Sequence, residues 1–323
     1  MSKYSKDVIQ ILYQHQTEYI SGQYIAERLS ISRTAVKKVI DQLKLEGCEI
    51  ESVNHKGHRL IHLPDKWYSG IVLPMIKAQN VFDQVEVLES INSTQLLAKQ
   101  RLVGNTETFL ILSDEQTQGK GRFNRPWSSS KGKGLWMSVV LRPNMPFEMI
   151  TKFNLFIALG IRDAIQQFSN DDVTIKWPND IYINQRKVCG FLTEMVANSD
   201  GIEAVICGIG INMNHLAKDF SEDLQQKATS IRIHADEKIN RYCFLQSLVN
   251  NIEHRYHQFI TEPFSTIRKE YIDASNIWNK TLRFTENSKQ FHGEALDIDQ
   301  DGFLHVKDEN DKHHRLISAD IEF

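Results

Sequence analysis

Two long stretches of the chain repeat hydrophobic residues with the period of an α-helix. The first is residues 150–168, where the apolar positions are Ile150, Phe153, Ile157, Ile161, Ala164, Ile165 and Phe168. The second is residues 245–259, where they are Leu245, Leu248, Ile252, Tyr256 and Phe259. In each stretch these positions fall on one side of a helix. Both therefore predict amphipathic helices that pack against a sheet.

Around these helices lie short runs rich in β-branched residues. They span 109–112, 135–141, 173–177, 181–183, 188–195 and 204–213. Several are separated by only a short turn, which favours antiparallel neighbours. The pattern predicts a multidomain α+β protein in which residues 65–275 form a central mixed α/β domain.

The first 64 residues have the pattern of a helix-turn-helix. Ser21 can cap a short helix that carries Ala26 and Leu29, and residues 30–32 supply a polar turn with a second potential cap. In that second helix Val36, Ile40 and Leu43 form one apolar stripe, at spacings of four and three residues. Two helices joined by a tight turn are therefore predicted.

Residues 49–63 follow as a predicted hairpin with a glycine-containing tip at 54–57, typical of the wing of a winged helix. Pro64 marks the expected end of this domain. From about residue 279 the chain changes to short alternating segments between polar turns. We expect residues 276–323 to form a small β-barrel of four or five strands.

Composition narrows the function only slightly. The net charge of −3 and the isoelectric point near 6.5 mean that any nucleic-acid contact must come from a local basic patch. No uncharged apolar stretch of about 18 residues and no leader pattern is present, so we expect a cytoplasmic protein without membrane contact. Its four cysteines are scattered without zinc-ligand spacing, which predicts buried free thiols.

The most unusual segment is residues 116–128, QTQGKGRFNRPWS, where glycines alternate with cationic side chains. Glycine lets main-chain amides approach an anion, and the cations neutralise phosphate or carboxylate oxygens. The segment lacks the Walker and dinucleotide-binding patterns. Taken alone, it is as typical of a solvated basic turn as of an anion-binding loop.

A second cluster is residues 173–183, in which a strand, a polar turn with Pro178 and another strand bring Lys176, Asn179 and Asp180 to one end of a sheet. Lys187 follows in what we expect to be a further turn. Locally, an Asx turn and solvated lysines explain these residues equally well. Together with the cations at 120, 122 and 125, they suit attack of a carboxylate on ATP.

Five motifs stand together in order: Ser93-Thr94, GKGRFNRPW at 119–127, KWPND at 176–180, KVCG at 187–190 and GIGIN at 208–212. On these motifs, over almost its whole length, the chain resembles the bifunctional biotin protein ligases that also repress biotin operons. The family usually has arginine where this chain has Lys120 and glycine where it has Asn124. The resemblance implies a winged helix-turn-helix, a class II synthetase-like ligase domain and an SH3-like barrel.

The resemblance also implies the site residues. The implied biotin-binding residues are Ser93, Thr94, Gln95, Gln116, Gly119, Lys120, Gly121, Arg122, Lys187, Gly190 and Gly208. The implied ATP-binding residues are Arg122, Arg125, Trp127, Ser128, Lys176, Asn179 and Asn212. Arg122, Lys187, Arg125 and Asp180 are the implied catalytic residues, with Asp180 assisting Mg²⁺ or orienting Lys187. Trp136, Met137 and Leu192 could wall the biotin pocket, although plain core packing is the preferred interpretation.

The implied reaction makes biotinyl-5′-AMP from biotin and ATP, and then transfers biotin to a lysine of a biotin carboxyl carrier domain. The adenylate would act as corepressor, and apolar Phe123 at the loop tip would contact a second copy in an adenylate-bound homodimer. The implied contacts with operator DNA are Ser32, Arg33, Thr34, Lys37, Lys38 and Lys56. A winged helix used only for protein contact is the less favoured alternative.

Three other functions remain open at this stage. One is a biotin-sensing repressor that catalyses nothing, against which the full set of cations argues. Another is a lipoate ligase, which shares the architecture but does not usually carry the Gly-Lys-Gly-Arg loop. The last is a ligase that has lost DNA binding.

Overall fold

A computed structural model describes residues 4–78, 81–199, 201–286, 289–317, 319 and 321–322. Its centre is a seven-stranded sheet in the order β3-β4-β5-β9-β8-β7-β6. The strands are β3 (Gln84–Leu88), β4 (Phe109–Ser113), β5 (Gly134–Leu141), β6 (Val173–Lys176), β7 (Asp180–Ile183), β8 (Arg186–Asn198) and β9 (Gly201–Asn212). Only β3 and β4 pair in parallel, which confirms the predicted mixed sheet.

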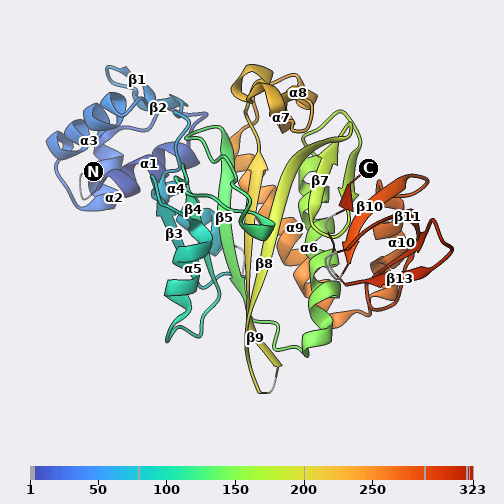
Figure 1. Cartoon of the computed structure of the whole chain (residues 1–323). Helices are drawn as coiled ribbons and strands as arrows, with labels where there is room; N and C mark the ends of the chain where they lie inside the picture. Colours follow the sequence, from blue (N-terminus) through green and yellow to red (C-terminus); the bar gives the residue numbers. More distant parts are fainter. Residues whose placement is uncertain are drawn as a thin grey trace.

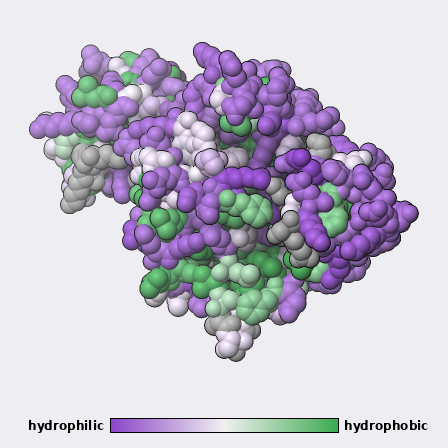
Figure 2. Space-filling model, in the orientation of Figure 1, coloured by the Kyte–Doolittle hydropathy of each residue, from purple (hydrophilic) through white to green (hydrophobic). Residues whose placement is uncertain are grey.

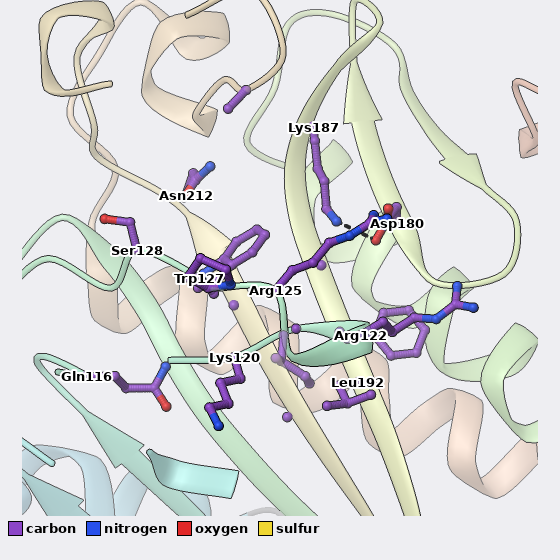
Figure 3. A pocket seen from close by; sticks show the side chains of 18 of the residues that line it. Gln116, Lys120, Arg122, Arg125, Trp127, Ser128, Asp180, Lys187, Leu192 and Asn212 are labelled. Atoms are coloured by element: carbon purple, nitrogen blue, oxygen red, sulfur yellow. Dashed lines mark ion pairs between the residues drawn. The ribbon is translucent and has the colours of Figure 1, made fainter. Parts of the chain in front are cut away.

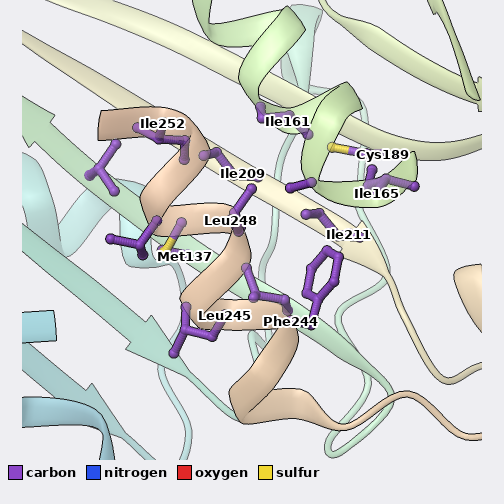
Figure 4. Close-up of a cluster of buried hydrophobic side chains, with 14 of the residues drawn as sticks. Met137, Ile161, Ile165, Cys189, Ile209, Ile211, Phe244, Leu245, Leu248 and Ile252 are labelled. Carbon is purple, nitrogen blue, oxygen red and sulfur yellow. The ribbon is translucent and has the colours of Figure 1, made fainter. Parts of the chain in front are cut away.

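The two helices predicted from periodicity cover one face of this sheet. They are α6 (Ile150–Gln166) and α9 (Arg241–Thr261), which lie side by side behind the strands (Figure 1). Figure 4 shows Leu245 and Leu248 of α9 packed against Met137 of β5 and Ile209 of β9. This face is dry and apolar, so the sheet can present polar chemistry only on its other face.

The other face is covered in part by α5 (Thr94–Leu102), whose Leu97 and Ala98 pack on Phe109, Ile111 and Ile206. The Ser93 hydroxyl caps this helix by accepting from the Leu96 N–H at 3.3 Å. Neither α5 nor β3 was predicted, because the apolar residues of α5 do not repeat with a helical period and β3 is a short edge strand. The loop that joins β4 to β5 crosses part of this face (Figure 1).

The N-terminal unit is the predicted helix-turn-helix with a wing. It contains α1 (Ser5–Gln14), α2 (Gly22–Leu29), α3 (Arg33–Leu45), β1 (Glu49–Val53) and β2 (Gly57–His62). Ser21 and Ser32 accept hydrogen bonds from Tyr24 N–H and Ala35 N–H, as N-caps that each stabilise a helix by about 1 kcal/mol. Helix α4 (Ser69–Lys77) then packs against α1 and joins this unit to the sheet.

The remaining helices are short or terminal. They are η1 (Arg122–Asn124), η2 (Phe147–Met149), η3 (Ala217–Asp219), α7 (Glu222–Gln225), α8 (Ile231–Ala235) and α10 (Ser265–Ala274). The tail forms a five-stranded antiparallel sheet of β10 (Thr281–Glu286), β11 (Lys289–Ile298), β12 (Leu304–Asp308), β13 (His313–Leu316) and β14 (Ile321–Glu322). The strand-rich tail is confirmed, while its closure into an SH3-like barrel stays a prediction.

One apolar cluster runs through all three parts, from Val8 in α1 to Ile321 in the tail. The core therefore marks no boundary, and the domain limits at 64/65 and 275/276 stay predictions. Cys48, Cys189 and Cys207 are buried free thiols as predicted, whereas Cys243 is exposed. That prediction was wrong for Cys243 because it lies on the outward side of the first turn of α9. Among the described helices, none is long and apolar enough to span a membrane.

Candidate functional site

A cavity of about 560 Å³ opens on the sheet face opposite α6 and α9. Its walls come from the start of α5, the β4–β5 loop, strands β7 to β9 and the segment that follows β9 (Figure 3). Most of the predicted site residues line it: Ser93, Thr94, Gln95, Gln116, Lys120, Gly121, Arg122, Arg125, Trp127, Ser128, Asn179, Asp180, Lys187, Gly190, Gly208 and Asn212. Folding thus gathers motifs that lie more than a hundred residues apart.

Lys187 and Asp180 form an ion pair inside the cavity, with Lys187 Nζ 2.7 Å from Asp180 Oδ1 (Figure 3). The two residues stand on adjacent antiparallel strands, β7 and β8, near their joining turn. Lys187 was expected in a turn, but the turn is Asn184-Gln185, both with positive φ, and Lys187 lies in β8. Strand β8 holds the Lys187 ammonium group at a fixed place, where it can bind an anion.

Arg122 lines the cavity, and its hydrogen-bond partners include Asn179 and Ala319. Its Nη1 donates to Asn179 Oδ1 at 3.1 Å, and Nη1 and Nη2 both donate to the carbonyl of Ala319 at 3.3 Å. Asn179 in turn donates to the Phe191 carbonyl at 2.6 Å. The glycine-rich loop, the KWPND turn and the tail therefore meet at one guanidinium group.

One end of the cavity is lined by uncharged hydrogen-bonding groups. Gln116 Oε1 accepts from the Thr94 N–H at 2.9 Å and from the Thr94 hydroxyl at 3.0 Å, and Thr94 also bonds Ser138 at 2.8 Å. Gln95 Nε2 donates to Glu194 at 2.8 Å. A Cβ on Gly208 would lie 2.2 Å from Gln95 Oε1, so only glycine leaves room for this amide. We call this the amide end.

The other end is built around the Trp127 indole. Gly190 and Gly210 face each other across β8 and β9. A Cβ on Gly210 would lie 2.5 Å from Trp127 Nε1, and one on Gly190 would lie 3.2 Å from Trp127 Cζ3. The two glycines form a flat seat for the indole, whose ring centroid is 5.3 Å from Lys187 Nζ. We call this the tryptophan end.

Two predicted site residues do not line the cavity. Gly119 lies beneath it, where a Cβ would meet the Trp127 carbonyl at 2.6 Å. Lys176 pairs with Asp180 in the β6–β7 ladder, and its ammonium group is 5.6 Å from the Tyr182 ring. Lys176 is therefore placed beside the site rather than in it.

The three apolar residues considered for the wall of the biotin pocket, Trp136, Met137 and Leu192, lie in different surroundings. Trp136 and Met137 are both buried, as core packing predicts, with the Met137 side chain against α9; Met137 is also among the residues that line the cavity, and Trp136 is not. Leu192 is only partly buried and lines the cavity (Figure 3), so core packing was the wrong preference for it. The reason is pairing: Leu192 stands opposite Gly208, which has no side chain to cover it.

Sequence analysis missed the segment that follows β9. His215, Asp219, Phe220, Ser221, Leu224, Lys227 and Ala228 all line the cavity. The His215 ring stacks on Phe220 at 5.1 Å, and burial lowers the pKa of His215 to about 4, so it is neutral at pH 7. The segment is attached to the sheet because Lys187 N–H donates to the Lys227 carbonyl at 2.8 Å. Its short helical turns carry no periodicity from which it could have been found.

Metal binding has little support from side chains alone. Over the residues that the structure describes, no group of three or more His, Cys, Asp or Glu side chains could hold a metal ion. Two carboxylates line the cavity, Asp180 and Asp219, and each is paired with a lysine, Lys187 and Lys133 respectively. A Mg²⁺ ion here would need most of its oxygen ligands from a bound phosphate.

The predicted DNA contacts lie far from the cavity on α3 and the wing (Figure 1). Ser32, Arg33, Thr34, Lys37 and Lys38 are exposed, and so is Lys56 at the hairpin tip. The apolar stripe of Val36, Ile40 and Leu43 is buried on the opposite side of α3. The Ser32 hydroxyl is already used as a helix cap, so it is a weaker candidate for a DNA contact than its neighbours.

Comparison with known proteins agrees with this division into three parts. Family models match residues 5–59 as an HTH domain, 87–212 as the biotin/lipoate A/B protein ligase family, and 279–323 as a biotin protein ligase C-terminal domain. A biotin protein ligase from Aquifex aeolicus, solved with biotin and ATP, superposes with a TM-score of 0.65 at 22% identity. It covers 75% of this chain and 99% of its own.

Two curated relatives carry the name bifunctional ligase/repressor BirA. The one from Bacillus subtilis is 37% identical over 318 residues, which is 98% of each chain. The one from Escherichia coli is 24% identical over 89% of this chain and 88% of its own. The chain therefore belongs to the family of bifunctional biotin ligase/repressor proteins.

Proposed function

We propose that this chain joins biotin to a lysine of an acceptor protein through biotinyl-5′-AMP, and that it represses transcription in response to biotin. The observation that carries the enzymatic part is the single cavity that combines an uncharged amide end, a Lys187–Asp180 pair and a tryptophan end. Biotin has an uncharged ureido ring and a carboxylate tail, and ATP has a flat base and a polyanionic tail. The cavity offers a matching group for each of these parts.

In the first half of the reaction, a biotin carboxylate oxygen attacks the α-phosphorus of ATP and the bond to the β-phosphate oxygen breaks. Pyrophosphate leaves, and the biotin carboxyl group becomes a mixed anhydride with AMP. Lys187 would bind the carboxylate and then the acyl-phosphate oxygens. Arg122 and Arg125 would oppose the charge on the α-phosphate and on the departing pyrophosphate.

The ring of biotin would lie at the amide end, where Ser93, Thr94, Gln95 and Gln116 supply donors and acceptors. Leu192 would pack against its apolar part. The adenine would lie on the Trp127 indole, with Ser128 and Asn212 as polar contacts. Placed this way, the biotin carboxylate and the α-phosphate meet beside Lys187, which makes attack intramolecular in effect.

In the second half, the ε-amine of the acceptor lysine attacks the acyl carbon and AMP leaves, which forms an amide. No enzyme nucleophile is needed, because the adenylate is itself the activated acyl donor. Asp180 would help to hold Mg²⁺, which would supply neutralisation of phosphate charge. The acceptor would be a biotin carboxyl carrier domain.

The regulatory half of the proposal rests on the N-terminal unit. Exposed Arg33, Thr34, Lys37 and Lys38 on α3 would contact operator DNA in the major groove, and Lys56 would reach the backbone. The adenylate would act as corepressor by promoting a homodimer. Phe123 is 67% exposed at the tip of the glycine-rich loop, with positive φ, and would form part of the contact. If Phe123→Gly dimerises normally with ligand bound, this contact is wrong.

The test of the enzymatic proposal is biotin-dependent exchange of radiolabelled pyrophosphate into ATP. We expect exchange with biotin and not with lipoate, and its loss in Lys187→Ala. Lys152→Ala is a matched control, because Lys152 lies outside the cavity and pairs with Asp301. Exchange with lipoate would favour a lipoate ligase. Tight biotin binding without exchange would favour a repressor that only senses biotin.

A further inference from the structure

The Glu194 carboxylate lies next to the amide end, although Glu194 belongs to none of the five motifs. Glu194 stands in β8 opposite Ile206 of β9, two residues after Leu192, so its side chain leaves the sheet on the face that carries the cavity. Its Oε2 accepts from Gln95 Nε2 at 2.8 Å, and its Oε1 accepts from Lys99 Nζ at 2.8 Å. Since Gln95 and Lys99 are one turn apart in α5, Glu194 joins β8 to this helix.

This contact fixes the direction of the Gln95 amide. An ionised carboxylate can only accept hydrogen bonds, so the NH2 group of the amide must face Glu194. The Leu192 and Ile206 carbonyls are acceptors as well, but each is 3.4 Å from Gln95 Nε2, where a hydrogen bond is weak. The amide oxygen points the other way, over Gly208, where a Cβ would lie 2.2 Å from it. Gln95 thus presents an acceptor to the cavity, and not a donor.

The hydroxyl groups beside the Gln95 oxygen cannot fully satisfy it. The hydroxyls of Thr94 and Ser138 have one proton each, yet they make three contacts: Thr94 with Gln116 at 3.0 Å, Thr94 with Ser138 at 2.8 Å, and Ser138 with Gln95 at 3.3 Å. The contact with Gln95 is the longest, so it is the one left without a proton. The amide end therefore lacks one donor, and a ligand with an N–H group at this position would supply it.

We propose that Glu194 is a positioning residue that makes the amide end selective for a ligand with an N–H donor, because it holds the Gln95 oxygen toward the cavity. The inference rests on the proposed function, in which the ureido ring of biotin lies at this end. A ureido ring has two N–H donors, whereas the dithiolane ring of lipoate has none. Without Glu194 the Gln95 amide can turn, and the site loses part of its preference for a donor.

The test measures the Kd of the full-length chain for biotin and for two carbamate analogues of biotin, in each of which an oxygen atom replaces one ureido N–H. The wild-type chain should bind the weaker analogue at least about 100-fold less tightly than biotin, since a site built to accept a hydrogen bond rejects a ligand without the donor. In Glu194→Met we expect the Kd for biotin to rise about tenfold, because Gln95 is no longer held as an acceptor. The preference over the analogue should fall at least about fivefold, because the amide can turn its NH2 group toward the new oxygen.

Three further variants sharpen the test. Glu194→Gln keeps an acceptor oxygen for Gln95 and should retain most of the affinity and the preference. Lys99→Met frees the Glu194 side chain from α5 and should shift both quantities in the same direction by a smaller factor, so it serves if Glu194→Met does not fold. The Lys99–Glu194 ion pair is partly exposed and adds little stability, which favours folded variants. Glu203→Met is the matched control, because Glu203 of the same hairpin pairs with Arg142, at 3.2 Å, instead of with α5.

Two outcomes overturn the inference: an unchanged preference in a folded Glu194→Met or Lys99→Met chain, or an equal loss of affinity for biotin and the analogues, which indicates a general loss of structure. The proposed function fails separately. If the wild-type chain binds biotin but shows no pyrophosphate exchange, it is no ligase, and the Kd comparison still decides the role of Glu194. If exchange proceeds and the preference does not depend on Glu194, the function stands and the inference falls.

Discussion

The cavity and the outer face of α3 are both rich in cations, yet they hold them in opposite ways. Inside the cavity Lys187 is paired with Asp180, and Arg122 is bound to Asn179 and Ala319. On α3, Arg33, Lys37 and Lys38 are exposed, and none of them forms an ion pair with any carboxylate that the structure describes. A fixed cation suits charge that develops at one point of a reaction, whereas a mobile exposed cation suits a phosphate backbone.

The largest expected effect on activity comes from breaking the Lys187–Asp180 ion pair. Asp180→Asn removes the charge that holds Lys187 Nζ in place, so we expect the kcat of pyrophosphate exchange to fall about 100-fold, as when one charge-stabilising group is lost. DNA binding without ligand should stay unchanged. Asp171→Asn is a useful control, because Asp171 pairs with His234 outside the cavity. A kcat within a factor of two of wild type would show that Lys187 needs no partner.

Replacing the exposed cations of α3 should weaken DNA binding and spare ligation. We expect Arg33→Ala with Lys37→Ala to weaken operator binding at least about tenfold and to reduce the slope of log affinity against log salt by about two, because two phosphate contacts are lost. Ligation should be spared. A gel-shift titration at several salt concentrations checks this. Unchanged affinity and slope would mean that the helix-turn-helix serves only protein contact, or that DNA binding has been lost.

Two glycines in the cavity allow the amide end and the tryptophan end to be tested separately. Gly208→Ala would place a methyl group against Gln95, and Gly210→Ala would place one against Trp127. We expect the first to raise the KM for biotin and the second the KM for ATP, each by about fivefold, since one methyl group can be worth 1–3 kcal/mol in a tight pocket. Each variant is the control for the other. If both raised the same KM, the assignment of the two ends would be wrong.

The smallest effect concerns a cationic site without an assigned function. His314 in the tail is buried between Glu286 and Asp308, at 2.8 and 2.9 Å. Burial alone would lower the pKa of His314, but the two carboxylates outweigh it and raise the pKa. A raised pKa in the folded state stabilises the fold below the unfolded value near 6.5, and this is lost as the pH rises through the folded pKa. We expect the Tm to fall by a few degrees over that range, and His314→Gln to lose the dependence.

If the Tm of wild type and His314→Gln fell in parallel as the pH rose, the histidine would not be the titrating group. The site matters for the comparison because His314 is paired on both sides but is not among the residues that line the 560 Å³ cavity. Pairing alone therefore does not mark an active site, and an opening large enough for a ligand is also needed.

Much of this molecule could be predicted from its sequence. The periods of 150–168 and 245–259 predicted α6 and α9, because side chains on one side of a helix must find an apolar partner whatever the fold. Caps at Ser21 and Ser32 were predictable because capping acts within three residues. The family was recognisable from five short motifs because the chemistry of phosphate and carboxylate groups restricts which residues can bind them.

Other features were decided only by the tertiary structure. Strand pairing puts Leu192 opposite Gly208, where its side chain is left open to the cavity, and turns the Met137 side chain toward α9. The segment 215–228 joins the site through main-chain bonds to Lys187, which no local pattern encodes. Asp114 accepts from the Trp67 N–H and pairs with Arg241, although the three residues are far apart in sequence. Such contacts depend on how distant segments are packed, and local sequence patterns record only what neighbouring residues can do for one another.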